Sequence, residues 1–581
     1  MSQNRIAVKR NGHIDHAPIV DAQSDSQGAF AGAQYLMGLQ IFVRLATFSM
    51  NILVIYIAGR KAFGVASIRF ELLLSTILFL SREGMRNALL RVDTTISGRN
   101  KPAASAQKRP SSQEQHIINA ALVPIAVGMM MASCLYWIYV GGSASMSEDF
   151  SFYQSSLTIY ILAAWIELCV EPLYVLSRAR VLFKLQAKCE AIAVTCRCVG
   201  VVATLLLGYY LTTDQSETNP LRLLAFSIGQ LAYAIAIIIS YAWYMSQELG
   251  YSIWLCYIPH KENGDGYISN AIGSLAATFV GQSLIKHLLT QGDSMVMARF
   301  ATAEEMGTFA LVSNYGSIPA RVFFLPLEEA SRAVFSKTAA ANNTANLTIS
   351  GSKSVKKDAQ AQIHNARNVL TALGKLQFLL GLFLIVFGAL YSPILAALAR
   401  QSDVAVSRAL AVYCAYLPFM GLNGFLEAFV HSVATKSQLI RINVWMAIFT
   451  VVYVLVAIEA LWRFKLGSAG IIGANMLNMA LRIIYCKMYI SKWFANISGP
   501  RFREMLPHPV VIGMCAGSGA ISIAMKTILS HLPSTPFHLS MLAIGGSLGI
   551  ATLISVWIYE QPFIRSVRAL RTGSLLHTKT E

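Results

Sequence analysis

The sequence carries few charged residues for its length. Only 13% of its 581 residues are Asp, Glu, Lys or Arg, whereas soluble domains carry about 25%. The mean hydropathy is +0.52, and repeated apolar runs of about 20 residues fit the thickness of a bilayer. The composition therefore argues against a soluble protein. A β-barrel does not fit either, because its strands would alternate in hydrophobicity over about 10 residues.

Familiar catalytic motifs are missing as well. We find no GxxxxGK[ST] loop, no HExxH and no GxSxG, so we expect neither an ATP motor nor an enzyme, and no cofactor. The nine cysteines show no spacing for a metal site and no disulfide framework. The polar first thirty residues lack the apolar core of a signal peptide, so we expect the first span to direct its own insertion.

The positive net charge of +18 fits a polytopic membrane protein. We predict about fourteen membrane helices, centred near residues 46, 73, 128, 165, 200, 234, 282, 317, 382, 419, 453, 479, 519 and 548. The spans near 73, 282 and 317 are the weakest by hydropathy because they contain charges. Loops such as SRARVLFKLQAK are basic and ATAEE and HLPSTPF are not, which predicts cytosolic termini. In this setting the basic residues do not indicate nucleic acid.

Ionisable residues recur inside the predicted spans, where they are costly and usually face a cavity or a partner. Glu167 and Glu171 lie one turn apart, so either one is protonated or a neighbouring arginine separates them. Cations outnumber acids in the first half, which suggests an anionic ligand, and arginine suits phosphate. Other readings stay open. The charges of Arg82, Glu83 and Arg86 would also fit the headgroup layer. Lys286 and Asp293 could form an internal pair. Asn475 and Asn478 could make hydrogen bonds between helices.

The stretch SNYGSIPARVFFLPLEEA, residues 313–330, is unusual for a membrane span. Its prolines and Gly316 predict a bent or broken helix, which is tolerated where the backbone lines a cavity or packs on protein. Orientation places Arg321 past mid-membrane and Glu328 and Glu329 near the cytosolic mouth. Arg332 follows closely enough to pair with them. We therefore expect a ligand-binding arginine and a separate structural pair.

Several stretches together resemble one family. They are QIFVRLATFSMNILVIYIAGRKAFGVASIRFELLLSTILFLSREGMRNALL, WIELCVEPLYVL, LLTQGDSMVMARF, NYGSIPARVFFLPLEEASRAVFSK, LNGFLEAFVHSVATK and GSAGIIGANMLNMALRI. In this order they resemble the Rft family of endoplasmic-reticulum proteins of dolichol-linked oligosaccharide assembly. The polar N-terminus and the basic segment 91–115 depart from the family pattern.

The resemblance implies an all-α fold like the multidrug and oligosaccharidyl-lipid exporters, with two six-helix lobes around a central cavity and two further helices. The implied order is a cytosolic N-terminus (1–32), an N-lobe (33–250), a cytosolic connection (251–270), a C-lobe (271–490) with a cytosolic loop (337–365), spans 13 and 14 (491–558) and a basic cytosolic tail (559–581). Residues 91–115 and 338–362 are polar enough to predict disorder.

The resemblance also implies a function. The expected partner is a dolichyl diphosphate-linked heptasaccharide, moved from the cytosolic to the luminal leaflet of the endoplasmic reticulum for N-glycosylation. The expected cavity residues are Arg44, Arg69, Lys286, Arg321, Asn475, Asn478 and Arg482. The expected gating or ion-pair residues are Arg82, Glu83, Arg86, Glu167, Glu171, Asp293, Glu328, Glu329 and Arg332. The alternatives are a non-transporting scaffold or chaperone for the glycolipid and a cation-coupled exporter of small molecules.

Overall fold

The protein is all-helical in the part of the chain that its computed structural model describes. That part comprises residues 54–89, 110–141, 150–211, 220–347, 353–398, 403–495 and 502–565, apart from short gaps inside these ranges. The predicted span near residue 46, with Arg44, lies outside the described residues, as do most of segment 91–115 and the end of the basic tail.

The first group of helices is the N-lobe, and its members pack on one another along their lengths. It contains α2 (Arg60–Val65), the π-helical turn η1 (Ala66–Phe70), α3 (Glu71–Leu89), α4 (Ser112–Gly141), α6 (Tyr153–Leu168), α7 (Glu171–Ala179), α8 (Phe183–Leu211) and α9 (Pro220–Leu249). The 3-10 turn η2 (Ile253–Tyr257) follows and leads to α10 (Asn270–Phe300).

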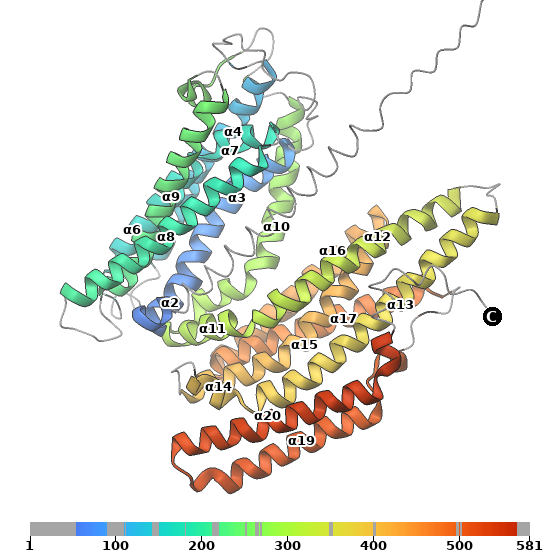
Figure 1. Cartoon of the computed structure of the whole chain (residues 1–581). Coiled ribbons are helices and arrows are strands. Elements are labelled where there is room, and N and C mark those ends of the chain that lie inside the picture. Colours follow the sequence, from blue (N-terminus) through green and yellow to red (C-terminus); the bar gives the residue numbers. More distant parts are fainter. Residues whose placement is uncertain are drawn as a thin grey trace, which may run out of the picture.

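The second group is the C-lobe. It contains α11 (Ala303–Gly316), the π-helical turn η3 (Ala320–Phe324), α12 (Leu325–Leu347), α13 (Lys353–Phe383), the π-helical turn η4 (Leu384–Ala389), α14 (Ser392–Leu398), α15 (Val404–Val433), α16 (Lys436–Trp462) and α17 (Gly467–Trp493). After α18 (Phe502–Met505), helices α19 (Pro509–Ile528) and α20 (Ser534–Tyr559), joined by η5 (Leu529–His531), pair with each other on the outside of this lobe (Figure 1).

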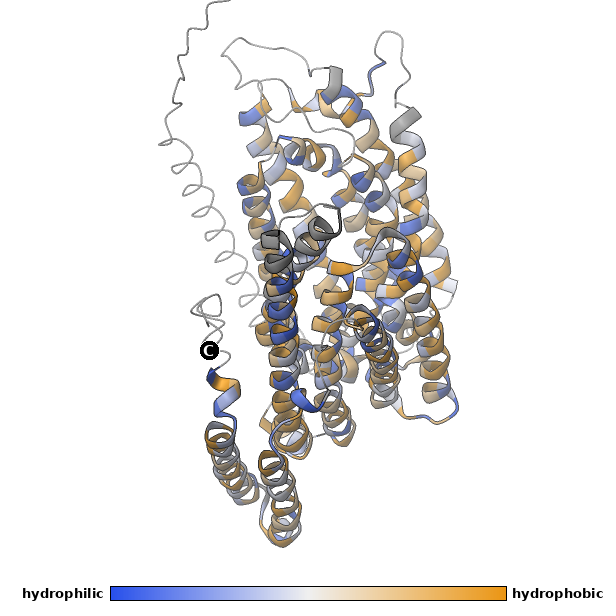
Figure 2. Cartoon of the chain, turned by 90° about the vertical axis from the view of Figure 1, so that its right-hand side faces the viewer, coloured by the Kyte–Doolittle hydropathy of each residue, from blue (hydrophilic) through white to orange (hydrophobic). Residues whose placement is uncertain are grey.

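The two lobes meet at one end. Figure 1 shows α2 beside α11 there, while the far ends of the two groups point in different directions. Helix α10, which the resemblance assigns to the C-lobe, contacts both lobes, because it packs on α3 of the N-lobe and on α16 of the C-lobe. Figure 2 shows hydrophobic residues along most of the length of the helices, including their outer faces. Exposed side chains such as Trp137, Leu207 and Val451 fit contact with lipid.

Eleven helices in the described part of the chain are long and apolar enough to cross a membrane, and they match eleven of the fourteen predicted spans. The predicted spans near 282 and 317 are also helical, as α10 and as the series α11–η3–α12, but do not reach that hydropathy. These are two of the three spans that the sequence marks as weak. The expected interruption near the prolines is confirmed, because α11 ends at Gly316 and a π-helical turn precedes α12.

The prediction of a polar loop at 337–365 is wrong for most of that segment. Helix α12 continues to Leu347 and α13 begins at Lys353, so helix covers the segment except for residues 348–352, which lie outside the described residues. The polar composition predicted disorder, but these residues form the outer ends of the long helices α12 and α13, which pack against each other. The end of the basic segment 91–115 is likewise helical, since α4 begins at Ser112.

Candidate functional site

The two carboxylates that the sequence places one turn apart each have their own arginine. Arg82 Nη1 lies 3.0 Å from Glu167 Oε1, and Arg86 donates to both oxygens of Glu171, at 2.5 and 2.6 Å. The helix also breaks between α6 and α7, with Pro172 in the first turn of α7. Both carboxylates are buried, at 7% and 1% exposure. The structure therefore shows the second of the two possibilities: a neighbouring arginine neutralises each carboxylate.

Glu83 does not pair with Arg86, although the two residues lie three positions apart on α3. It accepts instead from Lys286 on α10, at 3.2 Å, and from Asn87, at 3.3 Å. Arg86 stacks over the ring of Tyr174 at 3.9 Å. The α3 charges thus belong to contacts between helices rather than to a pair within α3.

Arg69 lies inside the N-lobe and is only 8% exposed. Its guanidinium carbon is 5.6 Å from the ring centroid of Tyr139 and 5.7 Å from that of Tyr153. No ion pair of Arg69 occurs among the residues that the structure describes, and its Nε has no hydrogen-bond partner. Two aromatic faces therefore hold this cation, as expected for cation–π contacts.

Lys286 and Asp293 on α10 do not form the internal pair that was one reading of their spacing. Lys286 contacts Glu83 and lies 5.3 Å from the ring centroid of Phe79, and its side chain is 63% exposed. Asp293 accepts from the backbone N–H of Ser294 at 2.8 Å. The two side chains therefore serve different contacts, the first toward the N-lobe.

Three of the expected cavity residues, Asn475, Asn478 and Arg482, lie on α17 in the C-lobe. Arg482 Nη1 lies 4.0 Å from Glu427 Oε2 on α15, and Glu427 also accepts from Asn423 at 2.8 Å. Asn478 is buried, at 6% exposure, and its Oδ1 has no hydrogen-bond partner among the residues that the structure describes, whereas Asn475 is half-buried. Arg482 is therefore compensated by a carboxylate, and the buried amide has acceptor capacity to spare.

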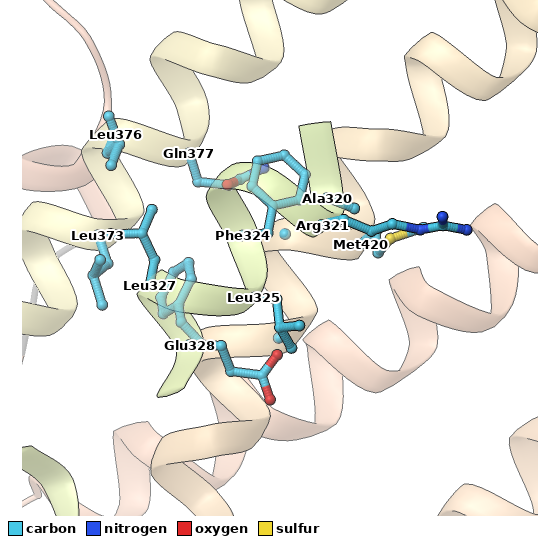
Figure 3. Close-up of a pocket in the computed structure, with 13 residues that line it drawn as sticks. Ala320, Arg321, Phe324, Leu325, Leu327, Glu328, Leu373, Leu376, Gln377 and Met420 are labelled. Carbon is cyan, nitrogen blue, oxygen red and sulfur yellow. The ribbon is translucent and has the colours of Figure 1, made fainter. Parts of the chain in front are cut away.

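A cavity of about 230 Å³ lies beside the π-helical turn of the interrupted span, between η3, α12, α13 and α15 (Figure 3). That volume is several times the roughly 30 Å³ share of one liquid water molecule. Its walls are mainly apolar, with Phe324, Leu327, Leu373, Leu376 and Met420 among them.

The polar members of the cavity wall are Arg321, Glu328 and Gln377. Glu328 accepts from Arg332 at 2.8 Å, as the sequence predicts, and Gln377 donates to the carbonyl of Pro418 at 3.2 Å. Arg321 is exposed, and none of the ion pairs in the described part of the chain includes it. Figure 3 shows its side chain extending away from Leu373 and Leu376, beside Met420. The cavity thus has an apolar interior, and the guanidinium at its edge, that of Arg321, enters no ion pair among the described residues.

The structure therefore distributes the predicted cavity residues over several places. Arg69 lies inside the N-lobe, Lys286 against α3, Arg321 beside α15, and the three α17 residues in the C-lobe. Glu329 is exposed, and Glu328 and Arg332 form the expected pair. The described residues contain no group of three or more His, Cys, Asp or Glu that could hold a metal ion.

The sequence interpretation missed one charged cluster, which we call the Arg60 cluster. Arg60 at the start of α2 contacts Glu304 at the start of α11 and Asp403 just before α15. A signal was available in principle, because all three residues lie beside predicted spans and at the same predicted end. No local pattern, however, pairs residues 244 and 343 positions apart.

The fold defines a class of protein, a helical membrane protein with many spans. Its arrangement is similar to that of the lipid II flippase MurJ in an inward closed conformation, with a TM-score of 0.52 and 13% sequence identity. The match covers 90% of this chain and 99% of the flippase. At that identity the likeness concerns the fold alone.

The sequence comparison identifies the family. The model of the family described as Rft protein matches residues 28–569, so the chain belongs to the Rft family. Among its relatives, the Man(5)GlcNAc(2)-PP-dolichol translocation protein RFT1 of Schizosaccharomyces pombe is 31% identical over 517 residues, covering 88% of this chain and 90% of the relative. The protein of that name from Xenopus tropicalis is 27% identical, covering 92% and 96%. The chain is accordingly a multi-pass translocation protein rather than an enzyme.

Proposed function

We propose that this protein moves a dolichyl diphosphate-linked mannose and N-acetylglucosamine heptasaccharide from the cytosolic to the luminal leaflet of the endoplasmic-reticulum membrane, with both termini in the cytosol. The names of the relatives support the cargo, and the MurJ-like fold supports transport by relative movement of two lobes. In this proposal the end where α2 meets α11 faces the lumen.

The observation that carries the proposal is the cavity beside Arg321. A prenyl diphosphate joins a doubly charged headgroup to a hydrocarbon chain, so its site needs a cation next to an apolar space. Arg321 supplies the cation, because its guanidinium donates two parallel hydrogen bonds to phosphate oxygens. The cavity walls of Phe324, Leu327 and Leu376 supply the apolar space for the first isoprene units. Glu328 does not repel the diphosphate strongly, since Arg332 compensates it.

The remaining cations have supporting roles in this proposal. Lys286 is exposed enough to reach an anion as well as Glu83, whereas Arg69 and Arg482 are held by tyrosines and by Glu427. Asn475 and Asn478 offer amides to sugar hydroxyls. Arg321 is therefore the first residue to test.

The test is transport by the full-length purified protein in sealed vesicles that contain a fluorescent diphosphate-linked oligosaccharide. We expect protein-dependent loss of lipid from one leaflet, and a rate about tenfold lower for Arg321→Ala, as for the loss of a charged hydrogen bond. Arg463→Ala is the matched control, because Arg463 is an exposed arginine at the end of α16. Binding of the lipid without movement would overturn transport and favour the scaffold or chaperone. If the lipid is neither bound nor moved, the proposed cargo is wrong.

A further inference from the structure

The contact between the two lobes at the α2 end joins buried apolar residues of α2, α11 and α15 and contains one buried arginine, Arg60. Arg60 donates from Nη2 to Glu304 Oε1 at 2.9 Å and from Nη1 to Asp403 Oδ2 at 2.5 Å. Its side chain is only 10% exposed, while those of Glu304 and Asp403 are 55% and 35% exposed. A single N-lobe cation thus joins the N-terminal ends of two different C-lobe helices, α11 and α15.

Both carboxylates are positioned by the helices that carry them. Asp403 accepts from the backbone N–H of Ala405 through its other oxygen, at 2.9 Å, and so caps α15 while it contacts Arg60. Glu304 lies in the first turn of α11. Carboxylates at helix N-termini are favoured by the helix dipole. These same termini would repel an arginine, so Arg60 depends on the two carboxylates for its place.

Backbone packing around Arg60 makes the contact tight. A Cβ added to Gly64 on α2 would lie 2.1 Å from the backbone nitrogen of Gly307 on α11, and one added to Gly307 would lie 2.5 Å from the carbonyl oxygen of Arg60. The two helices therefore touch backbone to backbone within one turn of the ion pairs. Cargo cannot pass between α2 and α11 while this contact persists.

We propose that the Arg60 cluster is a reversible clamp that keeps the lobes closed at the α2 end and opens when cargo leaves there. Opening separates Arg60 from both acids and exposes all three groups to water, which compensates part of the lost attraction. Separating this charged part of the contact costs less than separating an apolar part of equal area, because charges regain their hydration. The inference concerns the conformational change and holds for any cargo.

The experiment measures how accessible the closed end is. Thr308 on α11 is 2% exposed and is one residue from Gly307, so Thr308→Cys in a chain with its nine native cysteines replaced provides a buried thiol. The full-length protein is reconstituted in nanodiscs and treated with a bulky water-soluble maleimide. We expect slow labelling with Arg60 intact and labelling about fivefold faster or more with Arg60→Ala, the lower end of typical couplings between two conformations.

Matched variants separate a clamp from a general loss of structure. Lys61→Ala removes the same charge one residue away, where no ion pair occurs among the described residues, and should leave the labelling rate unchanged. Arg60→Lys keeps the positive charge and should be labelled more slowly than Arg60→Ala. Thermal unfolding is recorded for every variant.

Two results would overturn the clamp. One is an unchanged labelling rate in Arg60→Ala. The other is equally fast labelling in Arg60→Lys and Arg60→Ala, accompanied by equally low thermal stability of the two variants. Neither result depends on the lipid assay, so the clamp and the proposed cargo fail separately.

Discussion

Arg86 and Glu171 meet in a two-pronged ion pair that ties α3 to α7 inside the N-lobe. The side chain of Glu171 is 2% exposed and that of Arg86 is 19% exposed. Breaking a buried pair by removing one partner leaves an uncompensated charge, whereas replacing both partners by apolar residues is often nearly neutral. This asymmetry distinguishes a structural pair from a transport residue.

Glu171→Gln should therefore reduce stability by about 3 kcal/mol or more, because Arg86 loses its buried partner. The double variant Arg86→Met with Glu171→Leu should regain most of that loss. The measurement is thermal or denaturant unfolding in detergent, with Arg463→Ala as an exposed control. A double variant that is as unstable as Glu171→Gln would contradict a purely structural role.

Gly307→Ala should separate α2 from α11, because its Cβ would overlap the carbonyl of Arg60. Overpacking of this kind costs about 1–3 kcal/mol. We expect a lower unfolding temperature together with faster labelling of a Thr308→Cys reporter. Gly473→Ala is the control, since a Cβ there meets nothing within 4 Å. Equal behaviour of the two alanine variants would show that the helix crossing tolerates side chains.

Leu376→Trp should fill part of the cavity beside Arg321 and weaken binding of a prenyl diphosphate, because Leu376 lines the apolar wall. The expected loss is about tenfold in affinity, or 1.4 kcal/mol, measured with a photo-reactive analogue of the lipid. Leu455→Trp on α16 is the control, as Leu455 is 60% exposed. Unchanged binding in Leu376→Trp would place the hydrocarbon chain elsewhere.

Acid should open the Arg60 cluster only at low pH. The N–H of Ala405 and then the guanidinium of Arg60 stabilise the Asp403 carboxylate and lower its pKa below the ordinary 3.8. Because the pKa is lowered in the folded protein, its contribution is complete above about pH 3.8 and is lost as the pH falls through the lowered value. We expect the lobes to stay closed between about pH 7 and pH 5.

Energy transfer between dyes on Tyr210→Cys in the N-lobe and Phe464→Cys in the C-lobe follows this response, as both side chains are well exposed. Asp403→Asn removes the titrating carboxyl, so in this variant we expect no change in energy transfer as the pH falls below about 3.8. A transition near pH 6 that survives in Asp403→Asn would assign the response to another group.

Much of the fold follows from local features of the sequence. Apolar length predicts the spans, and Gly316 with its neighbouring prolines predicts the interruption before α12. The pair Glu328–Arg332 is also local, since residues four apart on a helix share a face. These features depend on backbone geometry within one or two turns, so a single chain segment specifies them.

The sequence by itself thus determined the class of protein, its helices and the presence of excess charge inside it. Only the tertiary structure decided which charges compensate one another. Glu171 is paired by Arg86, 85 residues away, and Arg60 by Asp403, 343 residues away. Such pairs depend on how each helix is rotated and shifted against its neighbours, which packing fixes across the whole chain. The same helix packing places Arg321 beside an apolar cavity, exposed and without an ion pair among the described residues.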